Sequence, residues 1–342
     1  MNAATAFEVF RVHGGKVEAA RAVFPGAPLP WIDLSTGISP WSYPHAPIAP
    51  EAFTRLPDPE SIAALEAAAA TSFGVSDPAN VIATPGSDLA LRILGRVFAD
   101  RSVAVVRPGY SGHMLAWGRA PVAPVAPDEI ESRAETHAVV VLANPNNPDG
   151  RFIAPDRLLS VAQRLAARDG ALIVDEAFGD VVPEQSVCSA LRDGLVVFRS
   201  FGKFYGLAGL RLGFVVVSHT AQREAFRQAL GDWPVSGPAV AIGTAAYEDI
   251  EWQSAQRERL IASARRLDGL LIRAGLTLVG GTPLFRLARC EDSDALFRHL
   301  AAHGILTRPF SRDATLLRFG LPAADETHWQ RLAIALNTRS TS

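Results

Sequence analysis

Short runs of apolar residues alternate with longer helical segments through the middle of the chain. The runs have the length of buried strands and occupy residues 81–83, 103–106, 138–142, 171–174, 195–198 and 214–217. Helices are predicted in the same region at residues 61–73, 89–98 and 155–168. Strands that are apolar throughout and separated by helices are typical of a mostly parallel sheet that is covered on both faces.

The two ends of the chain have other patterns. Residues 1–60 contain nine prolines, which excludes a mostly helical segment, and they are too apolar and aromatic to be disordered. We expect an extended arm there, followed by a large domain at residues 61–218. Residues 219–342 contain a long helix at 251–274, several short strands and a last helix at 325–336, which indicates a smaller α+β domain. The predicted fold class is therefore α/β with a second, smaller domain.

Composition and charge limit the expected partners. The 342 residues are 48% hydrophobic and 20% charged with a net charge of -2, so neither nucleic acid nor a membrane surface is an expected partner. No apolar run is long enough to span a bilayer, and the first residues lack the basic-then-apolar order of a signal peptide. Cys188 and Cys290 lack metal-ligand spacing, so we expect no metal site and a reducing, cytoplasmic setting.

Lys203 is the residue on which the functional prediction depends. It follows the apolar run 195–198 in the stretch Ser200-Phe-Gly-Lys-Phe-Tyr-Gly-Leu-Ala-Gly-Leu-Arg211, which has few other polar groups. Apolar surroundings favour the neutral amine, which attacks an aldehyde to form a Schiff base, and Arg211 is suited to hold a phosphate. An aldehyde with a phosphate suggests pyridoxal phosphate (PLP). A buried turn whose lysine extends its charged end to solvent explains this stretch alone equally well.

Other unusual residues follow the first two strands, at the edge of an α/β sheet where ligands bind. Gly86, Ser87 and Asp88 precede a helix and are suited to hold an anion at its N-terminus, although an ordinary turn and helix cap is the simpler explanation. Tyr110 follows the second strand. Its ring is suited to stack on a flat heterocycle, although packing in the core is the more common role of such a tyrosine.

Two further strand ends carry Asn144 and Asp175. Asn144 begins the string Asn-Pro-Asn-Asn-Pro-Asp-Gly150 and is suited to donate a hydrogen bond to a ligand oxygen, or to stabilise the turn itself. Asp175 is suited to pair with a protonated ring nitrogen. A magnesium-binding aspartate is the alternative, but the phosphate loop Gly-x-x-x-x-Gly-Lys-Ser/Thr that accompanies it is missing from the sequence. Each signal alone has a simpler explanation, whereas their ordered occurrence at successive strand ends has none.

This ordered set resembles the fold-type I, aspartate aminotransferase-like PLP enzymes over essentially the whole chain. The resemblance implies a large domain with a mostly parallel sheet between helices, a smaller α+β domain, and PLP as the cofactor. It implies that Lys203 binds the PLP aldehyde and that Asp175 pairs with the ring nitrogen. Tyr110 would stack on the ring and Asn144 would contact its phenolic oxygen. The residues implied to surround the phosphate are Gly86, Ser87, Asp88, Ser200 and Arg211.

The N-terminal segment narrows the resemblance. His13-Gly-Gly15, the string from Trp31 to Pro40, Thr54-Arg-Leu-Pro-Asp-Pro59 and Arg199-Ser-Phe-Gly-Lys203 resemble the threonine-phosphate decarboxylases of cobalamin biosynthesis, which are relatives of the histidinol-phosphate aminotransferases. The resemblance implies the substrate L-threonine O-3-phosphate, the product (R)-1-aminopropan-2-yl phosphate, and a homodimer. The implied substrate-binding residues are His13, Gly14, Gly15, Gly37, Arg308 and Arg318.

Three positions depart from the family pattern. Phe178 and Leu56 stand where many relatives carry tyrosine, so one contact to a cofactor oxygen and one to the phosphate of the other subunit are in doubt. Gly202 stands where relatives place a serine or threonine, which removes a further phosphate hydroxyl. We therefore expect the phosphate to depend strongly on Arg211.

Two alternatives stay open at this point. The residues do not separate decarboxylation from transamination, so the first alternative is an aminotransferase acting on histidinol phosphate or another amino-phosphate. The second is a PLP-binding regulatory protein without turnover, but it predicts an attached DNA-binding domain, and residues 1–60 contain no helix-turn-helix pattern. The histidines other than His13, His113 among them, lack ligand spacing, and most of them are expected to be surface or packing groups.

Overall fold

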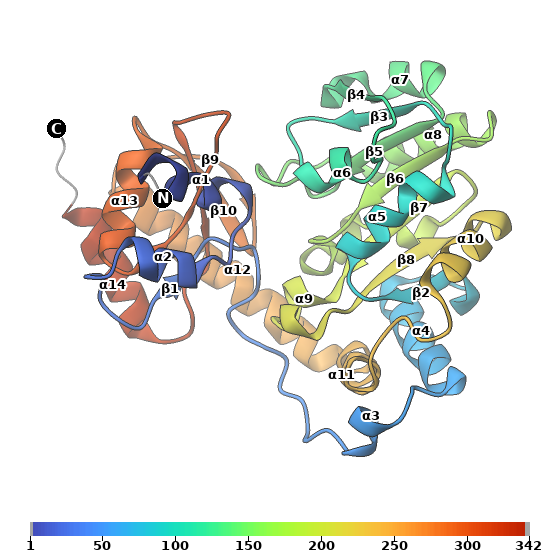
Figure 1. Cartoon of the computed structure of the whole chain (residues 1–342), viewed down its shortest axis with the longest axis horizontal. Coiled ribbons are helices and arrows are strands. Elements are labelled where there is room, and N and C mark those ends of the chain that lie inside the picture. Colours follow the sequence, from blue (N-terminus) through green and yellow to red (C-terminus); the bar gives the residue numbers. More distant parts are fainter. Residues whose placement is uncertain (1–2, 339–342) are drawn as a thin grey trace. The chain divides into compact units, whose positions relative to one another are not determined.

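The chain folds into two compact units in the computed structural model, which describes residues 3–338 and the side chains of residues 7–338. The small unit comprises residues 1–42, 148–150 and 255–342, and the large unit comprises the remainder, residues 43–147 and 151–254 (Figure 1). Since the chain enters the small unit at both ends, neither unit is a single continuous segment.

The large unit is built on a seven-stranded sheet with the order β2-β8-β7-β6-β5-β3-β4. Neighbouring strands from β7 to β4 run parallel, whereas β8 runs antiparallel to both β7 and β2. The mostly parallel sheet predicted from the apolar runs is thereby confirmed. The strands are β2 (Val81–Thr84), β3 (Val103–Val106), β4 (Val122–Val125), β5 (Val139–Ala143), β6 (Ala171–Asp175), β7 (Leu195–Ser200) and β8 (Gly213–Val217).

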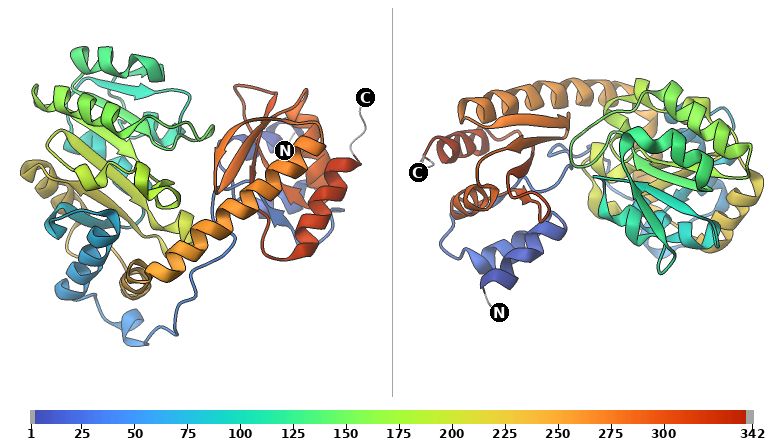
Figure 2. Two further views of the ribbon diagram at one scale, coloured as in Figure 1. Left: turned by 180° about the vertical axis from the view of Figure 1, so that it is seen from behind. Right: turned by 90° about the horizontal axis from the view of Figure 1, so that it is seen from above.

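Helices cover both faces of this sheet. Alternate strand residues such as Ile173 and Phe198 form a buried cluster with Leu91 and Leu94 of α5 on one face, while α8 covers the opposite face (Figures 1 and 2). Uninterrupted apolar strands are explained by this double coverage, because both sets of alternating side chains are buried. The helices of the unit are α3 (Glu51–Thr54), α4 (Pro59–Phe73), α5 (Ser87–Val97), α6 (Ser111–Leu115), α7 (Ile130–Thr136), α8 (Pro155–Ala166), α9 (Phe201–Phe204), α10 (Thr220–Leu230) and α11 (Gly237–Glu248).

The small unit contains a four-stranded antiparallel sheet and a short parallel strand pair. The sheet has the order β12-β13-β10-β9, and β1 (Ile32–Asp33) pairs with β11 (Ile305–Leu306). Most of α12 (Ile250–Arg273) belongs to this unit and runs along the sheet (Figure 2), where Asp268 pairs with Arg286 of β10. The other elements are β9 (Thr277–Thr282), β10 (Phe285–Arg289), β12 (Arg308–Pro309), β13 (Leu316–Gly320), α1 (Ala3–Val12), α2 (Val17–Val23), α13 (Ser293–Ala302) and α14 (Glu326–Asn337).

The first 60 residues differ from the single extended arm that their prolines suggested. The first proline is Pro25, and the proline-free segment before it forms α1 and α2. Phe7 and Phe10 are three residues apart, one helical turn, and their rings pack on Phe297 of α13. The proposed three-part division at residues 60 and 218 stays a prediction, and its outermost residues 1–2 and 339–342 lie outside the described residues.

Candidate functional site

The carboxyl ends of three parallel strands bring three of the predicted site residues together. Ala143 at the end of β5 is the register partner of Asp175 at the end of β6, which in turn faces Phe198 of β7. Asn144 follows directly, and its backbone N–H donates to the Asp175 carbonyl oxygen at 3.0 Å. Ser200 ends β7, where Lys203 follows within α9. The edge of the sheet therefore holds Asn144, Asp175 and Ser200 at the ends of adjacent strands, as parallel strands require, and Lys203 follows in the helix directly after β7.

Asp175 is buried and held by two hydrogen bonds. The residue is 5% exposed, its Oδ1 accepts from the Ala177 backbone N–H at 3.0 Å, and its Oδ2 lies 2.8 Å from His113 Nε2. His113 is itself fully buried. A buried carboxylate with fixed partners is oriented to bind one further donor, which fits the role of holding a protonated ring nitrogen.

His113 corrects the expectation that it is a surface or packing group. Its Nδ1 is buried without a hydrogen-bond partner among the described residues. Its Nε2, which lies in α6, forms the hydrogen bond to Asp175 Oδ2. The missed signal is its spacing: His113 follows Tyr110 by three residues, one turn into α6. Spacing alone would not have named Asp175 as the partner, because the two residues are 62 positions apart.

Tyr110 lies beside this pair and is held at its hydroxyl. The Tyr110 O–H donates to Asp88 Oδ1 at 2.9 Å, and the Tyr110 ring meets the His113 ring edge-on with centroids 5.5 Å apart. Burial, and next to it the Asp88 carboxylate, raise the pKa of Tyr110 far above its ordinary value, so the phenol stays neutral at physiological pH. Asp88, Tyr110, His113 and Asp175 thus form one continuous chain of contacts, which orients the tyrosine ring that we predict to stack on the cofactor.

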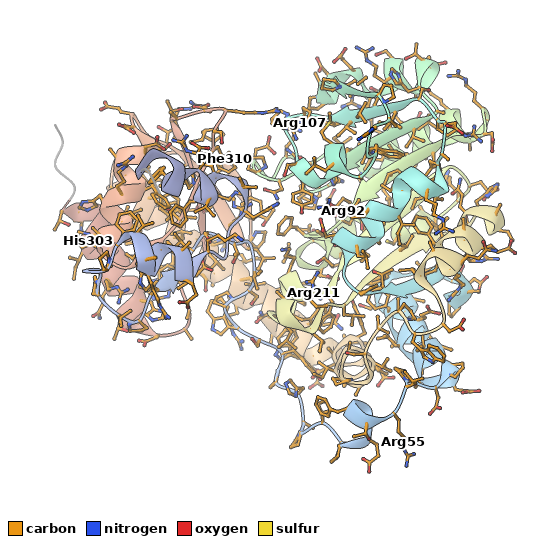
Figure 3. All side chains as sticks on the ribbon, viewed as in Figure 1. Arg55, Arg92, Arg107, Arg211, His303 and Phe310 are labelled. Carbon is orange, nitrogen blue, oxygen red and sulfur yellow. The ribbon has the colours of Figure 1, made fainter. Side chains whose placement is uncertain are left out.

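A cradle suited to a phosphate lies where α5 begins. Gly86 precedes the helix with φ of 91°, and a Cβ added there would lie 2.6 Å from Arg211 Nη2. A Cβ added at Gly213 would lie 2.5 Å from the Ser87 backbone nitrogen, so both glycines keep space beside the helix N-terminus. Arg211, labelled in Figure 3, has left-handed backbone (φ 55°) and an exposed side chain. Helix amides and a guanidinium facing the same space form an anion site.

Lys203 stands in the apolar setting that its sequence suggested. Its neighbours Phe201, Phe204 and Tyr205 are buried, while Lys203 is half-buried. Gly202 before it now has a structural reason: a Cβ there would lie 2.6 Å from the Ala208 Cα. A serine or threonine at this position would therefore need the backbone at Ala208 to move.

Asn144 is buried at the turn that follows β5, and the departures from the family pattern at Phe178 and Leu56 differ in exposure. The Asn144 side chain is 1% exposed, accepts from the Ile153 N–H at 2.9 Å and donates to the Ile153 carbonyl at 3.1 Å, so it also closes its own turn. One amide N–H of Asn144 stays available, and its contact to a cofactor oxygen stays a prediction. Phe178 is buried, whereas Leu56 is 62% exposed and lines a hollow of about 980 Å³ together with Trp233.

The predicted substrate-binding residues gather in the small unit. Arg308 and Arg318 are register partners on β12 and β13. Arg318 is 3% exposed and its Nη2 donates to the Ser35 carbonyl at 2.9 Å, while the Ser35 hydroxyl accepts from the Gly15 N–H at 2.8 Å. A Cβ added at Gly14 would lie 2.3 Å from the Ser35 oxygen, so the His13–Gly15 loop can approach only with glycine there.

Ser35 is therefore a residue that the sequence interpretation missed, since it links the glycine loop to the buried arginine. Gly37 is buried two residues further along the same segment.

Two arginines and one aspartate, Arg308, Arg318 and Asp33, lie close together in this part of the small unit, so positive charge is in excess there. Burial and then the neighbouring Arg308 lower the pKa of the Arg318 guanidinium, which Asp33 partly offsets. Burial also raises the pKa of Asp33, against the hydrogen bonds that it accepts from Ser35. Two neighbouring guanidiniums with one acid near them are suited to bind an anion of more than one charge.

The described residues fit PLP. A carboxylate for the ring nitrogen, an aromatic ring, a half-buried lysine and an anion cradle all occur in the large unit, and the two cradle glycines leave the volume that a phosphate needs.

Within residues 3–338, no group of three or more histidine, cysteine, aspartate or glutamate side chains is arranged to hold a metal ion. The helices of that same range include none that is both long and apolar enough to cross a membrane.

Comparison with known proteins agrees with this arrangement. The family model for class I and II aminotransferases matches residues 48–338. A threonine-phosphate decarboxylase of Pseudomonas aeruginosa is 42% identical over 327 residues, covering 95% of this chain and 96% of that protein. Another from Sinorhizobium sp. is 39% identical over 328 residues, covering 95% and 97%.

The solved histidinol-phosphate aminotransferase of Sinorhizobium meliloti in complex with pyridoxal-5'-phosphate has the same fold. Its TM-score is 0.76 at 24% identity, and the match covers 93% of this chain and 92% of that one. The aspartate aminotransferase-like fold expected from the sequence is thereby confirmed. The chain belongs to the class I and II aminotransferase family, and its similarity to threonine-phosphate decarboxylases extends over nearly its whole length.

Proposed function

We propose that this protein is a PLP-dependent decarboxylase of L-threonine O-3-phosphate, which releases carbon dioxide and forms (R)-1-aminopropan-2-yl phosphate for the aminopropanol arm of cobalamin. The observation that carries the choice of substrate is the similarity over about 95% of the chain to proteins named threonine-phosphate decarboxylase. The chemistry is supported independently by the large unit, where Tyr110 lies beyond the end of β3, Asp175 ends β6 and Lys203 follows β7.

PLP, when bound, supplies an electron sink for the pair released as a bond to the substrate Cα breaks. The residues of this chain determine how well that sink works. Asp175 Oδ2, oriented by His113, would hold a proton on the ring nitrogen, which would increase the electron demand of the ring. Arg211 and the first amides of α5 would hold the phosphate.

Lys203 has two tasks in this proposal. When PLP is bound, its Nζ would hold the cofactor aldehyde, and the substrate, arriving as an ammonium, would take that place and leave its protons on the released Lys203 amine. The resulting Lys203 ammonium would then deliver a proton to Cα, from which the carboxylate has left as carbon dioxide. The broken bond is Cα–C, its electron pair ends in the new Cα–H bond, and no keto acid takes part.

Arg308 and Arg318 select the bond that breaks. The substrate carries a carboxylate and a phosphate, and the two guanidiniums are suited to anchor those charges. A bond to Cα breaks most easily when it stands perpendicular to the ring, because its electrons then overlap with the ring system. Anchoring both anions turns the carboxylate into that direction in a decarboxylase and the Cα–H into it in an aminotransferase.

The test is a product analysis of the purified protein supplied with PLP. We expect L-threonine O-3-phosphate to be converted to carbon dioxide and aminopropanol phosphate without any keto acid, and Lys203→Ala to abolish both the visible cofactor band and turnover. A requirement for 2-oxoglutarate, with glutamate as product, would instead assign the chain to the histidinol-phosphate aminotransferase activity.

We further propose a homodimer in the cytoplasm. Leu56 and Trp233 are 62% and 55% exposed and line the same hollow, and Phe53 nearby in sequence is 69% exposed, which is the kind of apolar surface that subunit interfaces cover. Both cysteines are free thiols, which fits a reducing compartment. Sedimentation equilibrium tests the dimer: Trp233→Glu should yield monomer, and a monomeric parent protein would contradict the proposal.

A further inference from the structure

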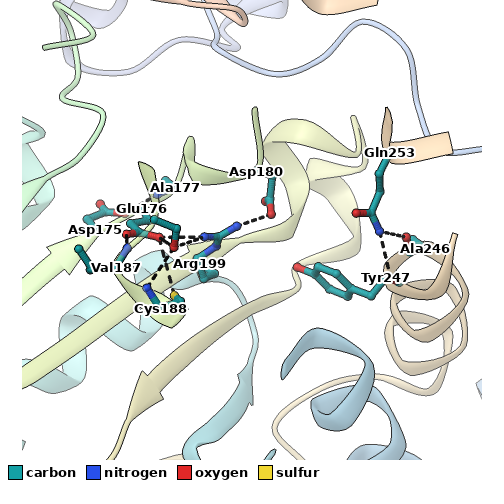
Figure 4. A network of polar contacts seen from close by, with 11 residues as sticks. Asp175, Glu176, Ala177, Asp180, Val187, Cys188, Arg199, Ala246, Tyr247 and Gln253 are labelled. Atoms are coloured by element: carbon teal, nitrogen blue, oxygen red, sulfur yellow. Dashed lines mark hydrogen bonds and ion pairs between the residues drawn. The ribbon is translucent and has the colours of Figure 1, made fainter. Parts of the chain in front are cut away.

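A buried ion-pair network lies directly behind the proposed cofactor site (Figure 4). Arg199 is 2% exposed and its Nη1 donates to Glu176 Oε2 at 2.8 Å, while its Nη2 donates to Asp180 in the short turn Gly179–Val181. The network thus joins the end of β7, which carries Arg199, to the segment that follows β6. None of its three charged side chains has been given a part in the mechanism above.

At the ends of β6 and β7, a residue of the proposed site and a member of the ion-pair network occupy neighbouring positions along the chain. Asp175 shares the sheet face of Ile173, and Ser200 shares the face of Phe198, by the two-residue period of a strand. Glu176 and Arg199 are the next positions along and therefore point to the opposite face. Each strand end consequently carries one residue for the site and, one peptide away, one member of the ion pair.

Glu176 is fixed more completely than an ordinary carboxylate. Its Oε2 accepts from Arg199 and from the Ser186 hydroxyl at 2.6 Å, and its Oε1 accepts from the Val187 N–H at 2.8 Å. Its backbone N–H also donates to the Phe198 carbonyl at 2.9 Å. With both ends of the residue held, the peptide between Asp175 and Glu176 has one orientation, and the Asp175 side chain starts from that peptide.

The guanidinium is equally constrained on its other sides. It lies over the Phe73 ring with Cζ 4.4 Å from the centroid, and a Cβ added at Gly179 would lie 2.9 Å from Arg199 Nη1. A planar group held by a ring, two carboxylates and the Ser186 hydroxyl at 3.2 Å cannot tilt without breaking a contact. Since Lys203 follows Arg199 by four residues, the same group fixes the start of the lysine segment.

We propose that the Arg199–Glu176 pair is a positioning element, which sets the spacing between Asp175 and Lys203 from the opposite face of the sheet. The pair acts through the backbone and touches neither cofactor nor substrate. Asp180 serves in this proposal only to balance and hold the second arm of the guanidinium. The inference rests on the proposed PLP chemistry and deepens it, since it assigns the geometry of that site to residues outside it.

The test compares Glu176→Gln with Asp180→Asn in the full chain loaded with PLP. Each variant removes one negative charge from a buried partner of the same guanidinium, so a purely structural or purely electrostatic role predicts similar effects from both. A positioning role predicts that Glu176→Gln lowers kcat roughly 10- to 100-fold, with KM changed less than about threefold, because misplacing a reacting group costs about that much. Asp180→Asn should lower kcat less than about threefold.

Two measurements report position without relying on turnover. PLP is achiral, so the circular dichroism of its visible band arises from the fixed asymmetric setting, and this signal should change in Glu176→Gln but not in Asp180→Asn. In the chain prepared without PLP, the Ala177 amide, which donates to Asp175 Oδ1, should exchange hydrogen at least about tenfold faster in Glu176→Gln only. Equal changes in both variants, or none in either, would overturn the proposal.

Ser186→Ala covers the case that Glu176→Gln does not fold. It removes one hydrogen bond to Glu176 and leaves every charge in place, so the dichroism and exchange should change in the same direction by a smaller amount. A Ser186→Ala protein identical to the parent in both readouts would contradict the positioning role. A parent protein without a Lys203-dependent visible band would refute the proposed function itself, which is a distinguishable failure.

Discussion

The hydrogen bond between His113 and Asp175 gives the sharpest test of the site geometry. His113→Phe keeps a ring of similar size and removes the donor 2.8 Å from Asp175 Oδ2. Both side chains are buried, at 0% and 6% exposure, so water cannot replace the lost partner. Asp175 would retain only the Ala177 N–H as a donor to its carboxylate, among the hydrogen bonds described.

The magnitude follows from burial. A hydrogen bond to a charged group contributes about 1.5–3 kcal/mol, and a buried acceptor left without its partner loses that amount in full. We therefore expect the free energy of unfolding of the chain without PLP to fall by about 1.5–3 kcal/mol in His113→Phe. PLP should also dissociate more readily, because the carboxylate that binds its ring nitrogen is no longer held in one orientation.

Urea unfolding and equilibrium dialysis measure these two quantities. His45→Phe is the matched control, since His45 is an exposed histidine of the same unit whose Nδ1 lies 2.9 Å from the neighbouring Ala46 carbonyl oxygen. The control should change the free energy of unfolding by less than about 0.5 kcal/mol. The reasoning is refuted if His113→Phe stays within that same limit and retains PLP as the parent does.

Three further predictions follow from the cradle, the lysine segment and the buried thiol. Arg211→Ala should weaken PLP binding about 10- to 100-fold in equilibrium dialysis, since it removes a charge-assisted contact to the phosphate. Arg92→Ala, which removes a guanidinium from α5 itself, should change PLP binding less than about threefold, and unchanged retention in Arg211→Ala contradicts the cradle. Gly202→Ser should lower the free energy of unfolding by about 1–3 kcal/mol without tightening PLP binding, because the added Cβ would lie 2.6 Å from the Ala208 Cα. Tighter PLP binding at an unchanged free energy of unfolding would contradict this prediction. Burial, with the Glu176 charge, raises the pKa of the Cys188 thiol to about 12. The unfolded thiol loses its proton at about pH 8.5 and the folded one far higher, so this stabilisation is complete below that pH and declines by about 1.4 kcal/mol per pH unit above it. Urea unfolding between about pH 9 and 10 should therefore show a steeper loss for the parent than for Cys188→Ala, and equal slopes would contradict a buried, protonated thiol.

Most of the fold was predictable because its strands are buried on both faces. The six apolar runs coincide with β2, β3, β5, β6, β7 and β8, to within two residues at either end. The edge strand β4 escaped prediction because Val122–Val125 contains a proline and only Val125 of its four residues is fully buried. The antiparallel direction of β8 has no signal in an apolar run, since direction depends on the path of the connecting chain.

The candidate site was predictable where it depends on strand ends. Asn144, Asp175 and Ser200 are brought together because parallel strands place their carboxyl ends at one edge, and that inference needs only the order of the strands. His113 and Ser35 were not predictable, because their partners lie 62 and 283 residues away and only tertiary packing brings them together. The same limit applies to the partners of Arg199, because the family resemblance marks this arginine in the sequence but does not show that it pairs with Glu176 and Asp180.

The most direct test of the central claim is the fate of the substrate carboxylate. L-Threonine O-3-phosphate labelled with carbon-13 at its carboxylate is incubated with the protein and PLP, in the absence of any keto acid, and followed by carbon-13 NMR. The account predicts that the label appears as carbon dioxide and bicarbonate in step with unlabelled aminopropanol phosphate, and that Lys203→Ala releases none. No labelled carbon dioxide in that sample, with the label instead retained in a keto acid once 2-oxoglutarate is added to a second sample, would contradict it.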